Sequence, residues 1–518
     1  MIAASRATDR PPINPALDLS QEPDLNILEA FAHPVRRQPH APAFVTPDRV
    51  VSYLEADERI RRMAGALRAL GLGVGDRVAL RLPNSPSFVL AILALARLGA
   101  VAVPVPRHRP AEQLAPTVQG LGIAWTLGLG EPDALPETRL VAVDDALLEP
   151  VSDAERTLAH APGADALALI TLSSGTTGQA KAMGRSHHRI WRQWEQQQRI
   201  RPHGPGVRMA VMMGLDTNYA VMTCLRMLLS GATVVLPADA GMASLADAVD
   251  RLGANHVLMS PAIVGRLMAQ LPHDRQRFPG LQTFRLAGSL VQPTLLLQLR
   301  RRICDNVCSD YGASEVGALA DGDREAIDRL PGSVGYLMPW VVGEACDDQG
   351  RALPAGTSGR LRFRGEGFPE SYLDDPEASA KVFVDGWFYP GDTGRIHADG
   401  AVVLEARSDE IINVGGTKVR PDEVEQVLLQ DENIVEAAAY GAQTEGGRTL
   451  LLAALVCRGP VDEQQTLQRC RALLGQRAPA RLIKLERLPR NEAGKVLRRE
   501  LAARTKIRTA EPEAQPGE

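Results

Sequence analysis

Apolar and polar residues in the first part of the chain follow two periods, one typical of helices and one typical of short buried strands. Residues 50–70 begin with a short apolar run and continue with apolar residues at helical spacing. A strand at 77–82, a helix at 87–98 and a strand at 100–105 follow. This alternation predicts a doubly wound, largely parallel sheet.

The same alternation returns after a loop at 172–182. The expected elements are a helix at 186–198, a strand at 207–213, a helix at 219–229, a strand at 232–236, a helix at 244–252 and a strand at 256–259. They predict a second winding of the same kind. From about residue 332 to 404, glycines separate short alternating strands, which indicates a small β-barrel or distorted sheet.

The pattern changes again near Asp409, where helices and strands begin to form a compact α+β unit of their own. A chain of 518 residues also exceeds one ordinary core. We therefore expect an α/β fold in two parts. A large N-terminal domain, 1–408, holds two doubly wound sheets plus a small β-barrel. A small mobile C-terminal α+β domain, 409–504, precedes a tail at 505–518 whose composition predicts disorder.

Composition narrows the class of protein. A hydrophobic content of 45% with 23% charged residues is typical of a globular protein, and a net charge of −4 gives no indication of nucleic acid or of an anionic membrane surface. The N-terminus lacks an apolar signal segment, and Arg97 interrupts the most apolar stretch, 88–105, so no membrane span is expected. Six scattered cysteines fit reduced thiols in a cytoplasmic protein.

The loop at 172–182, LSSGTTGQAKA, directly follows an apolar run at 166–172. Its glycines let backbone N–H groups turn inward, its hydroxyls add donors, and its lysine adds positive charge, so the loop is suited to a polyphosphate. Only two residues separate Gly178 from Lys181, which differs from the P-loop spacing. A solvated turn is the alternative interpretation. The expected phosphate-binding residues are Ser173, Ser174, Gly175, Thr176, Thr177, Gly178 and Lys181.

This loop resembles the signature of the adenylate-forming enzymes, which include acyl-CoA and aryl-CoA synthetases, adenylation domains of nonribosomal peptide synthesis, and luciferases. Ala180 and Ala182 stand where the family usually has proline and glycine. Four further stretches match the family in its order, between residues 283 and 499. The resemblance implies ATP and Mg²⁺ as cofactors.

The segment DYGASE at 310–315 resembles the family's adenine and magnesium motif, with Ser314 in place of threonine. The resemblance implies that Ser314 contacts the α-phosphate and that Glu315 binds Mg²⁺, a hard cation that prefers carboxylate oxygens. A surface turn is the alternative. The residues implied in binding adenine are Ala287, Gly288, Ser289, Asp310, Tyr311 and Gly312.

Two more stretches imply the rest of the nucleotide site and a moving domain. Asp392 resembles the family's ribose ligand, since a carboxylate accepts hydrogen bonds from vicinal hydroxyls, and Arg407 resembles its partner. Asp409 resembles the hinge, and Gly415 and Gly416 would let a pantetheine arm pass close to the backbone.

Near the C-terminus, Lys495 lies in the segment LPRNEAGKVLRR and resembles the family's catalytic lysine. When a carboxylate attacks the α-phosphate, negative charge builds on the oxygens in transfer, and a positioned ammonium group stabilises that charge. A solvated surface lysine is the alternative interpretation.

The acid pocket is expected around Asp216, Asn218, Tyr219 and Met222. By an ungapped count, Asp216 falls where many CoA ligases have a histidine, and Asn218 falls where amino-acid-activating domains have an aspartate. Because asparagine offers no formal negative charge, the sequence favours an aryl or aliphatic acid over an α-amino acid.

These observations predict an AMP-forming acid–thiol ligase that activates a carboxylic acid and transfers it to coenzyme A. The nearest alternative is a freestanding adenylation enzyme that loads the phosphopantetheine of a carrier protein in trans. An oxidative, luciferase-like activity and a catalytically inactive nucleotide-binding regulator are more distant alternatives.

Overall fold

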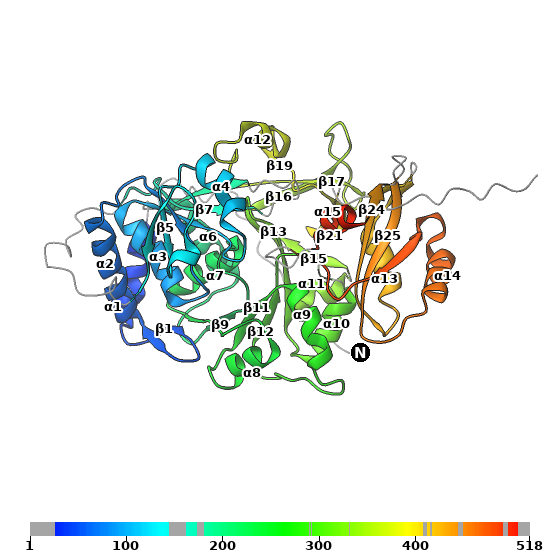
Figure 1. The fold of residues 1–518 in the computed structure, drawn as a ribbon, viewed down its shortest axis with the longest axis horizontal. Coiled ribbons are helices and arrows are strands. Elements are labelled where there is room, and N and C mark those ends of the chain that lie inside the picture. The colour runs from blue at the N-terminus through cyan, green and yellow to red at the C-terminus, as the bar shows by residue number, and fades with distance from the viewer. Residues whose placement is uncertain are drawn as a thin grey trace, which may run out of the picture.

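A computed structural model describes most of the chain: residues 26–144, 162–173, 181–289, 291, 293–330, 332–407, 412–414, 417–443, 449–490 and 496–505. Figure 1 shows a large body that runs from the blue N-terminal helices to the yellow strands, with the orange and red C-terminal elements at one end. Residues 506–518 of the predicted C-terminal tail lie outside the described residues.

The first winding forms a sheet with the strand order β6-β5-β3-β4-β7-β8. Its strands are β3 (Arg77–Leu80), β4 (Val101–Pro104), β5 (Trp125–Gly128), β6 (Arg139–Ala142), β7 (Leu167–Leu172) and β8 (Ala182–Ser186). All neighbouring pairs are parallel except β7 and β8. Helices α2 (Tyr53–Ala69), α3 (Pro86–Leu98) and α4 (Ala111–Gly120) connect or flank these strands.

Helix α3 shows why the sequence folds this way locally. Ser85 caps its N-terminus by accepting the N–H of Phe88, and Pro86 occupies the first turn, where the missing N–H costs nothing. Gly99 ends the helix in the left-handed region at φ 72°. Ten of the 13 helical residues are buried, so α3 is a core helix, as the apolar run before Arg97 predicts.

In the second winding, the neighbouring strands from β1 to β13 are parallel. Strands pair in the order β13-β12-β11-β9-β10-β1, and β2 closes the edge antiparallel. The strands are β1 (Pro42–Val45), β2 (Val50–Ser52), β9 (Arg208–Val211), β10 (Thr233–Val235), β11 (His256–Met259), β12 (Thr283–Leu286) and β13 (Val307–Ala313). The flanking helices are α1 (Ile27–Arg37), α6 (His187–Ile200), α7 (Asn218–Leu229), α8 (Met242–Asp250), α9 (Pro261–Leu267) and α10 (Pro293–Arg302).

The strands predicted as a small β-barrel or distorted sheet continue this second sheet. β14 (Gly317–Gly322) pairs antiparallel with β13 on one side and with β15 (Ser333–Leu337) on the other. Hydrogen bonding therefore runs without a break into the glycine-rich region, which the local sequence pattern could not reveal. The remaining strands are β16 (Val341–Cys346), β17 (Gly359–Gly365), β18 (Phe383–Val384), β19 (Trp387–Phe388), β20 (Asp392–Ile396) and β21 (Ala401–Arg407). Helices α11 (Arg324–Arg329) and α12 (Pro376–Val382) lie between them in the chain.

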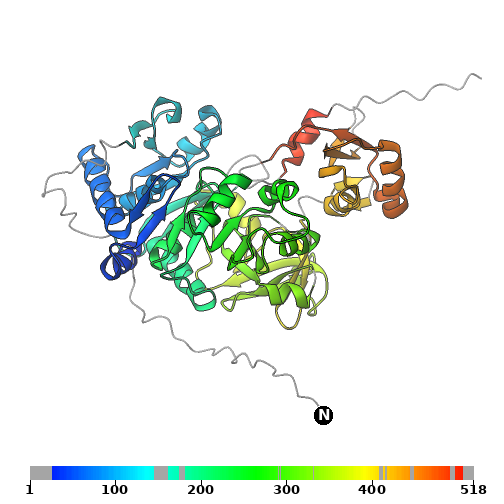
Figure 2. The same ribbon diagram turned by 90° about the horizontal axis from the view of Figure 1, so that it is seen from below.

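The C-terminal elements pair only with one another among the described residues. Strands β24 (Ile434–Gln443), β25 (Thr449–Cys457) and β26 (Arg481–Lys484) form one sheet, and β22 (Ile412–Val414) and β23 (Thr417–Val419) form a hairpin. Helices α13 (Pro421–Leu428), α14 (Glu463–Leu474) and α15 (Arg498–Arg504) complete the unit, which has its own apolar clusters. Figure 2 shows these elements apart from the large body.

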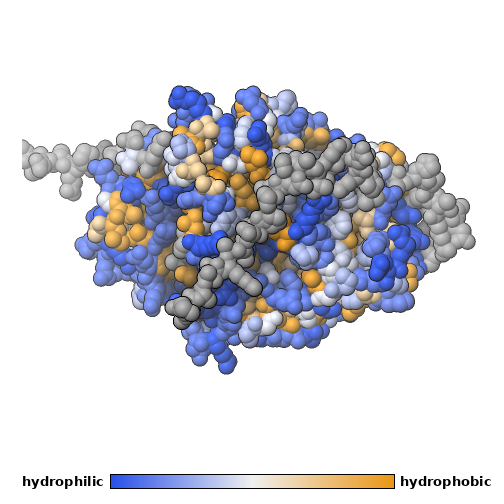
Figure 3. All heavy atoms as spheres, turned by 180° about the vertical axis from the view of Figure 1, so that it is seen from behind, coloured by the Kyte–Doolittle hydropathy of each residue, from blue (hydrophilic) through white to orange (hydrophobic). Residues whose placement is uncertain are grey.

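The surface facing away from the viewer of Figure 1 is largely hydrophilic, with apolar residues in separate patches (Figure 3). Among the helices that the structure describes, none has both the length and the apolar character needed to cross a membrane.

Candidate nucleotide and acid site

The ends of the predicted phosphate loop lie at the junction of β7 and β8. The N–H of Ser173 donates to the carbonyl oxygen of Lys181 at 2.8 Å, which brings the two ends of the loop together. The ammonium group of Lys181 lies 4.8 Å from the centre of the Tyr372 ring. Ser174, Gly175, Thr176, Thr177 and Gly178 lie outside the described residues.

The predicted adenine segment follows β12. Strand β12 ends at Leu286, and Gly288 has a φ of 99°, which residues other than glycine rarely adopt. Among the described residues, a Cβ at Gly288 would meet the Met213 methyl group at 3.6 Å, an ordinary van der Waals contact.

The predicted adenine residue Tyr311 and the predicted ribose ligand Asp392 are in direct contact. The Tyr311 hydroxyl donates to Asp392 Oδ2 at 2.6 Å, and both residues are buried. Asp392 begins β20 and pairs with Arg407 across the β20–β21 ladder. The strand register therefore places the two predicted ribose ligands directly opposite each other.

Position 312 requires glycine for a structural reason that the sequence did not reveal. A Cβ at this position would lie 2.3 Å from the carbonyl oxygen of Gly317 on the adjacent strand. The close approach of β13 and β14 thus requires glycine here, whatever the nucleotide contacts.

The buried Arg185 and the partly buried Arg189 hold the backbone of Ser314 and Glu315. Arg185 donates to the carbonyl oxygen of Ser314, and Arg189 donates to that of Glu315 at 2.8 Å. Burial, together with the nearby Arg189, lowers the pKa of Arg185 to about 9, and burial lowers the pKa of Arg189 to about 10. The sequence analysis missed both residues. The sequence signal that could have indicated them is their separation by four positions across the junction of β8 and α6.

Glu315 has a fixed orientation suited to a cation. The Tyr372 hydroxyl donates to Glu315 Oε1 at 2.8 Å, and an ionised carboxylate has further acceptor positions for a metal ion. Within the described residues, no group of three or more His, Cys, Asp or Glu side chains could hold a metal ion. A single carboxylate fits Mg²⁺ when phosphate oxygens and water complete its coordination.

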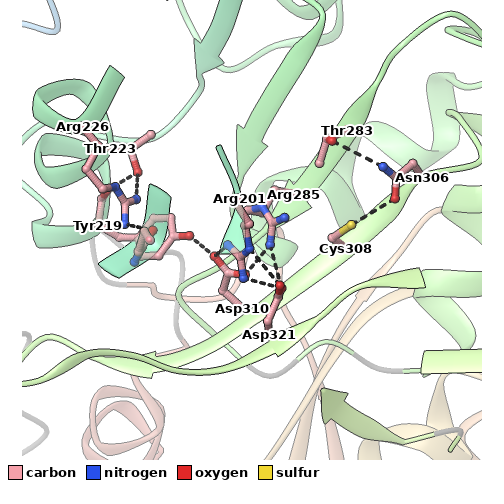
Figure 4. A network of polar contacts seen from close by, with 11 residues as sticks. Arg201, Tyr219, Thr223, Arg226, Thr283, Arg285, Asn306, Cys308, Asp310 and Asp321 are labelled. Atoms are coloured by element: carbon pink, nitrogen blue, oxygen red, sulfur yellow. Dashed lines mark hydrogen bonds and ion pairs between the residues drawn. The ribbon is translucent and has the colours of Figure 1, made fainter. Parts of the chain in front are cut away.

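The Asp310 side chain forms ion pairs within the protein. Its carboxylate is only 2% exposed and accepts hydrogen bonds from Arg201, Arg285 and the Tyr219 hydroxyl (Figure 4). Burial would raise its pKa, but the two arginines hold that pKa well below the ordinary value. Because these bonds take the acceptor positions of the carboxylate, the backbone of Asp310 is the part left for a nucleotide contact, and that contact stays a prediction.

Asp310 belongs to a network that reaches the predicted acid pocket. Arg201 and Arg285 also contact Asp321, and the Arg226 guanidinium lies 5.5 Å from the centre of the Tyr219 ring. Burial and the neighbouring Asp310 raise the pKa of Tyr219 to about 12, so its hydroxyl stays protonated and donates.

Helices α6 and α7 form two walls of a cavity of about 300 Å³. It is lined by His188, Arg189, Arg192, Gln193, Gln196, Gln197, Asn218, Tyr219, Met222, Arg226, Val316, Gly317, Ala318, Trp340, Glu366, Gly367 and Phe368. Of the predicted pocket residues, Asn218, Tyr219 and Met222 line it, and they lie on one face of α7. Asp216 does not, because it precedes the helix.

The wall formed by α6 was not predicted. Arg189, Gln193 and Gln197 follow one another at intervals of four, so they share one helical face. Polar residues at that spacing are common on solvated helices, and only the packing of α6 beside α7 makes them a cavity wall. Asp409, Gly415, Gly416 and Lys495 lie outside the described residues, as does the side chain of Arg407.

The two wound sheets and the separate C-terminal unit define an α/β enzyme of the adenylate-forming class. The model of the AMP-binding enzyme family matches residues 31–373, about two thirds of the chain, and the chain belongs to this family. The family and fold predictions are thereby confirmed.

Relatives match over nearly the whole chain. A feruloyl-CoA synthase from Amycolatopsis sp. is 28% identical over 492 residues, which cover 91% of this chain and 98% of the relative. A fatty acid–[acyl-carrier-protein] ligase from Streptomyces coeruleorubidus is 26% identical, with coverage of 94% and 98%. The solved structure of o-succinylbenzoate CoA synthetase from Bacillus subtilis with ATP and magnesium has a TM-score of 0.80 at 22% identity and covers 91% and 98% of the two chains.

Proposed function

We propose that the protein is an AMP-forming acid–CoA ligase. The observation that carries this proposal is the continuity of two sites along β13 and β14. Tyr311 contacts Asp392 on the nucleotide side, and Val316, Gly317 and Ala318 line the cavity a few residues further on. Ser314 and Glu315 lie between the two, where a bound acid and an α-phosphate would meet.

In the first half-reaction, a carboxylate oxygen of the acid attacks the α-phosphorus of ATP, a P–O bond forms, and pyrophosphate leaves. Ser173 and Lys181, with the loop between them, bind the β- and γ-phosphates, and Ser314 donates to an α-phosphate oxygen. Arg185 and Arg189 fix the backbone that presents Ser314 and Glu315. Magnesium bound at Glu315 supplies positive charge to the phosphates.

In the second half-reaction, the thiol sulfur attacks the acyl carbon and AMP leaves. We assign this step to a domain rotation about Asp409 that withdraws Lys495 and brings Gly415 and Gly416 to the thiol path. The division into domains 1–408 and 409–504 is part of this proposal. The self-contained pairing of β24, β25 and β26 supports it.

Coenzyme A is the preferred acceptor because the feruloyl relative, which matches over nearly its full length, carries a CoA ligase name. The carrier-loading alternative rests on the Streptomyces relative, whose name specifies an acyl carrier protein. The free cysteines in the described residues, most of them buried, support a cytoplasmic location.

The test is acid-dependent exchange between ATP and pyrophosphate over a panel of benzoates, cinnamates, fatty acids, dicarboxylic acids and amino acids. Exchange with one class of acid establishes adenylation, and a second assay with coenzyme A or a carrier protein identifies the acceptor. Lys495→Ala is expected to lose exchange far more than thioester formation from preformed adenylate. Equal loss of both would contradict the assignment of Lys495.

A further inference from the structure

One wall of the acid cavity carries a positive charge that the protein does not neutralise directly. Arg226 lies on α7, two turns beyond Asn218, and its hydrogen bonds go to the neutral side chains of Gln197, Thr223 and Tyr219. Among the described residues, no carboxylate forms an ion pair with it. Burial lowers the pKa of Arg226, which indicates that the surroundings do not fully compensate its charge.

Asp310, whose negative charge acts on Arg226, has no acceptor position left for it. A carboxylate offers about four lone-pair positions. Arg201 donates two hydrogen bonds to Asp310, and Arg285 and the Tyr219 hydroxyl donate one each. Figure 4 shows Tyr219 between Arg226 and Asp310. The two carboxylates of this network, Asp310 and Asp321, pair with Arg201 and Arg285. The Arg226 guanidinium is therefore the excess positive charge of the network, and it lies at the cavity.

The other cavity arginines serve as internal comparisons. Arg192 contacts the carboxylates of Glu195 and Glu366, so its charge is balanced. Arg189 is occupied with the carbonyl oxygens of Gly184 and Glu315. Arg226 thus differs from Arg192, because its hydrogen bonds go to neutral groups only. Arg189 also pairs with neutral groups, but its hydrogen bonds hold the backbone of Gly184 and Glu315.

We propose that the acid substrate carries a second carboxylate and that Arg226 binds this distal group. The inference rests on the proposed ligase function and narrows its substrate to compact dicarboxylic acids. Gln193, Gln196 and Gln197 line the same cavity and can donate amide hydrogens to the distal carboxylate. A long aliphatic acid would leave these polar groups and the Arg226 charge buried without partners, which is unfavourable.

The geometry also limits the length of the acid. A cavity of about 300 Å³ admits a short chain or a single ring between the two carboxylates, so we expect a compact diacid.

The primary test uses the wild-type chain and matched pairs of acids in the ATP–pyrophosphate exchange assay. One series compares α,ω-dicarboxylic acids of increasing length with monocarboxylic acids of equal length. A second compares benzene-1,4-dicarboxylate with 4-methylbenzoate. We expect kcat/KM to favour the best diacid by about 10- to 100-fold, the usual effect of a hydrogen bond to a charged group, with a clear optimum in length.

Variants assign the preference to Arg226. Arg226→Met is expected to lower exchange with the best diacid by a similar factor and to leave the monocarboxylic acids nearly unchanged, while Arg226→Lys retains part of the preference. Arg199→Met is the matched control, because Arg199 lies on the exposed side of α6 with Glu195 as its partner and its removal changes the net charge equally. The control should keep the wild-type ratio of diacid to monoacid.

The outcomes separate the two proposals. Exchange with monocarboxylic acids that equals or exceeds exchange with diacids overturns the second-carboxylate inference and leaves the ligase function intact. A diacid preference that survives Arg226→Met overturns the role of Arg226. No exchange with any acid, while ATP still binds, overturns the ligase function and the inference with it.

Discussion

The hydroxyl of Tyr311 donates a 2.6 Å hydrogen bond to Asp392, although 81 residues separate them in the chain. In the proposed nucleotide site, this bond orients the carboxylate that accepts the ribose hydroxyls. Tyr311→Phe keeps the ring and its edge contact with Phe363 but removes the donor. We expect the KM for ATP to rise by about 10- to 100-fold, as for the loss of one buried hydrogen bond to a charged group, with the KM for the acid unchanged. Steady-state kinetics with each substrate varied in turn measures both values.

Asp392→Asn is the companion variant, because it keeps the shape and removes the charge. It is expected to weaken ATP binding at least as much as Tyr311→Phe, and the double variant should show less than the product of the two effects, because the residues are in contact. Fully independent effects would mean that Tyr311 does not act through Asp392.

Tyr372 is expected to tune the magnesium requirement. Its hydroxyl donates to Glu315 Oε1 at 2.8 Å, and its ring packs against Phe383 with centres 5.4 Å apart. Tyr372→Phe keeps this packing and frees the carboxylate to rotate. The Mg²⁺ concentration for half-maximal exchange should rise several-fold, with a smaller change at saturating Mg²⁺. A Mg²⁺ titration of both proteins measures this, and superimposable curves would remove Tyr372 from the metal site.

The sequence predicted elements well where one periodicity dominates a long segment. Helix α3 and the strands around it are examples, because an apolar run with a serine cap and a glycine end leaves few alternatives. The continuous sheet through β13, β14 and β15 was not predictable, since pairing between distant strands depends on register that no local pattern specifies. Because the pairing could not be predicted, the sequence indicated only a small β-barrel or distorted sheet for these strands.

Some site residues could be identified from the sequence, whereas the roles of others depend on packing between distant elements. Tyr311, Asp392 and Asn218 were identified by motif or count, and the first two are in contact. Asp310 was assigned to the nucleotide because it lies in the motif, and the structure adds that its carboxylate forms ion pairs with Arg201 and Arg285. Arg226 was missed because an arginine in a helix is usually solvated, and only the packing of α6 beside α7 places it at a cavity.

Asn218 is expected to select the acid. It lies at the first position of α7, lines the cavity, and its buried side-chain oxygen has no hydrogen-bond partner among the described residues. A hydroxyl or an amino group on the acid would satisfy it. Asn218→Leu should therefore lower kcat/KM for hydroxylated acids by roughly 10-fold or more relative to acids without a donor. The acid panel measured with both proteins provides the test; an unchanged ranking would remove Asn218 from substrate recognition.

His187 makes the stability of the protein sensitive to acid. It is fully buried at the first position of α6, and neither ring nitrogen has a hydrogen-bond partner among the described residues. Burial lowers its pKa from 6.5 to about 4. Between these values the unfolded chain binds a proton that the folded chain excludes, so stability falls as pH drops from about 6.5 to about 4.

The contribution of this one residue is at most about 2 kcal/mol between pH 7.5 and pH 5. Leucine at this position cannot bind a proton, so His187→Leu should lose less stability over that range than the wild type, whatever its stability at pH 7.5. Thermal unfolding at a series of pH values measures the difference between the two slopes. His256, whose pKa burial also lowers to about 4, remains in both proteins, so part of the acid sensitivity should persist. Parallel curves for the two proteins would show that His187 is protonated equally in the folded and unfolded states.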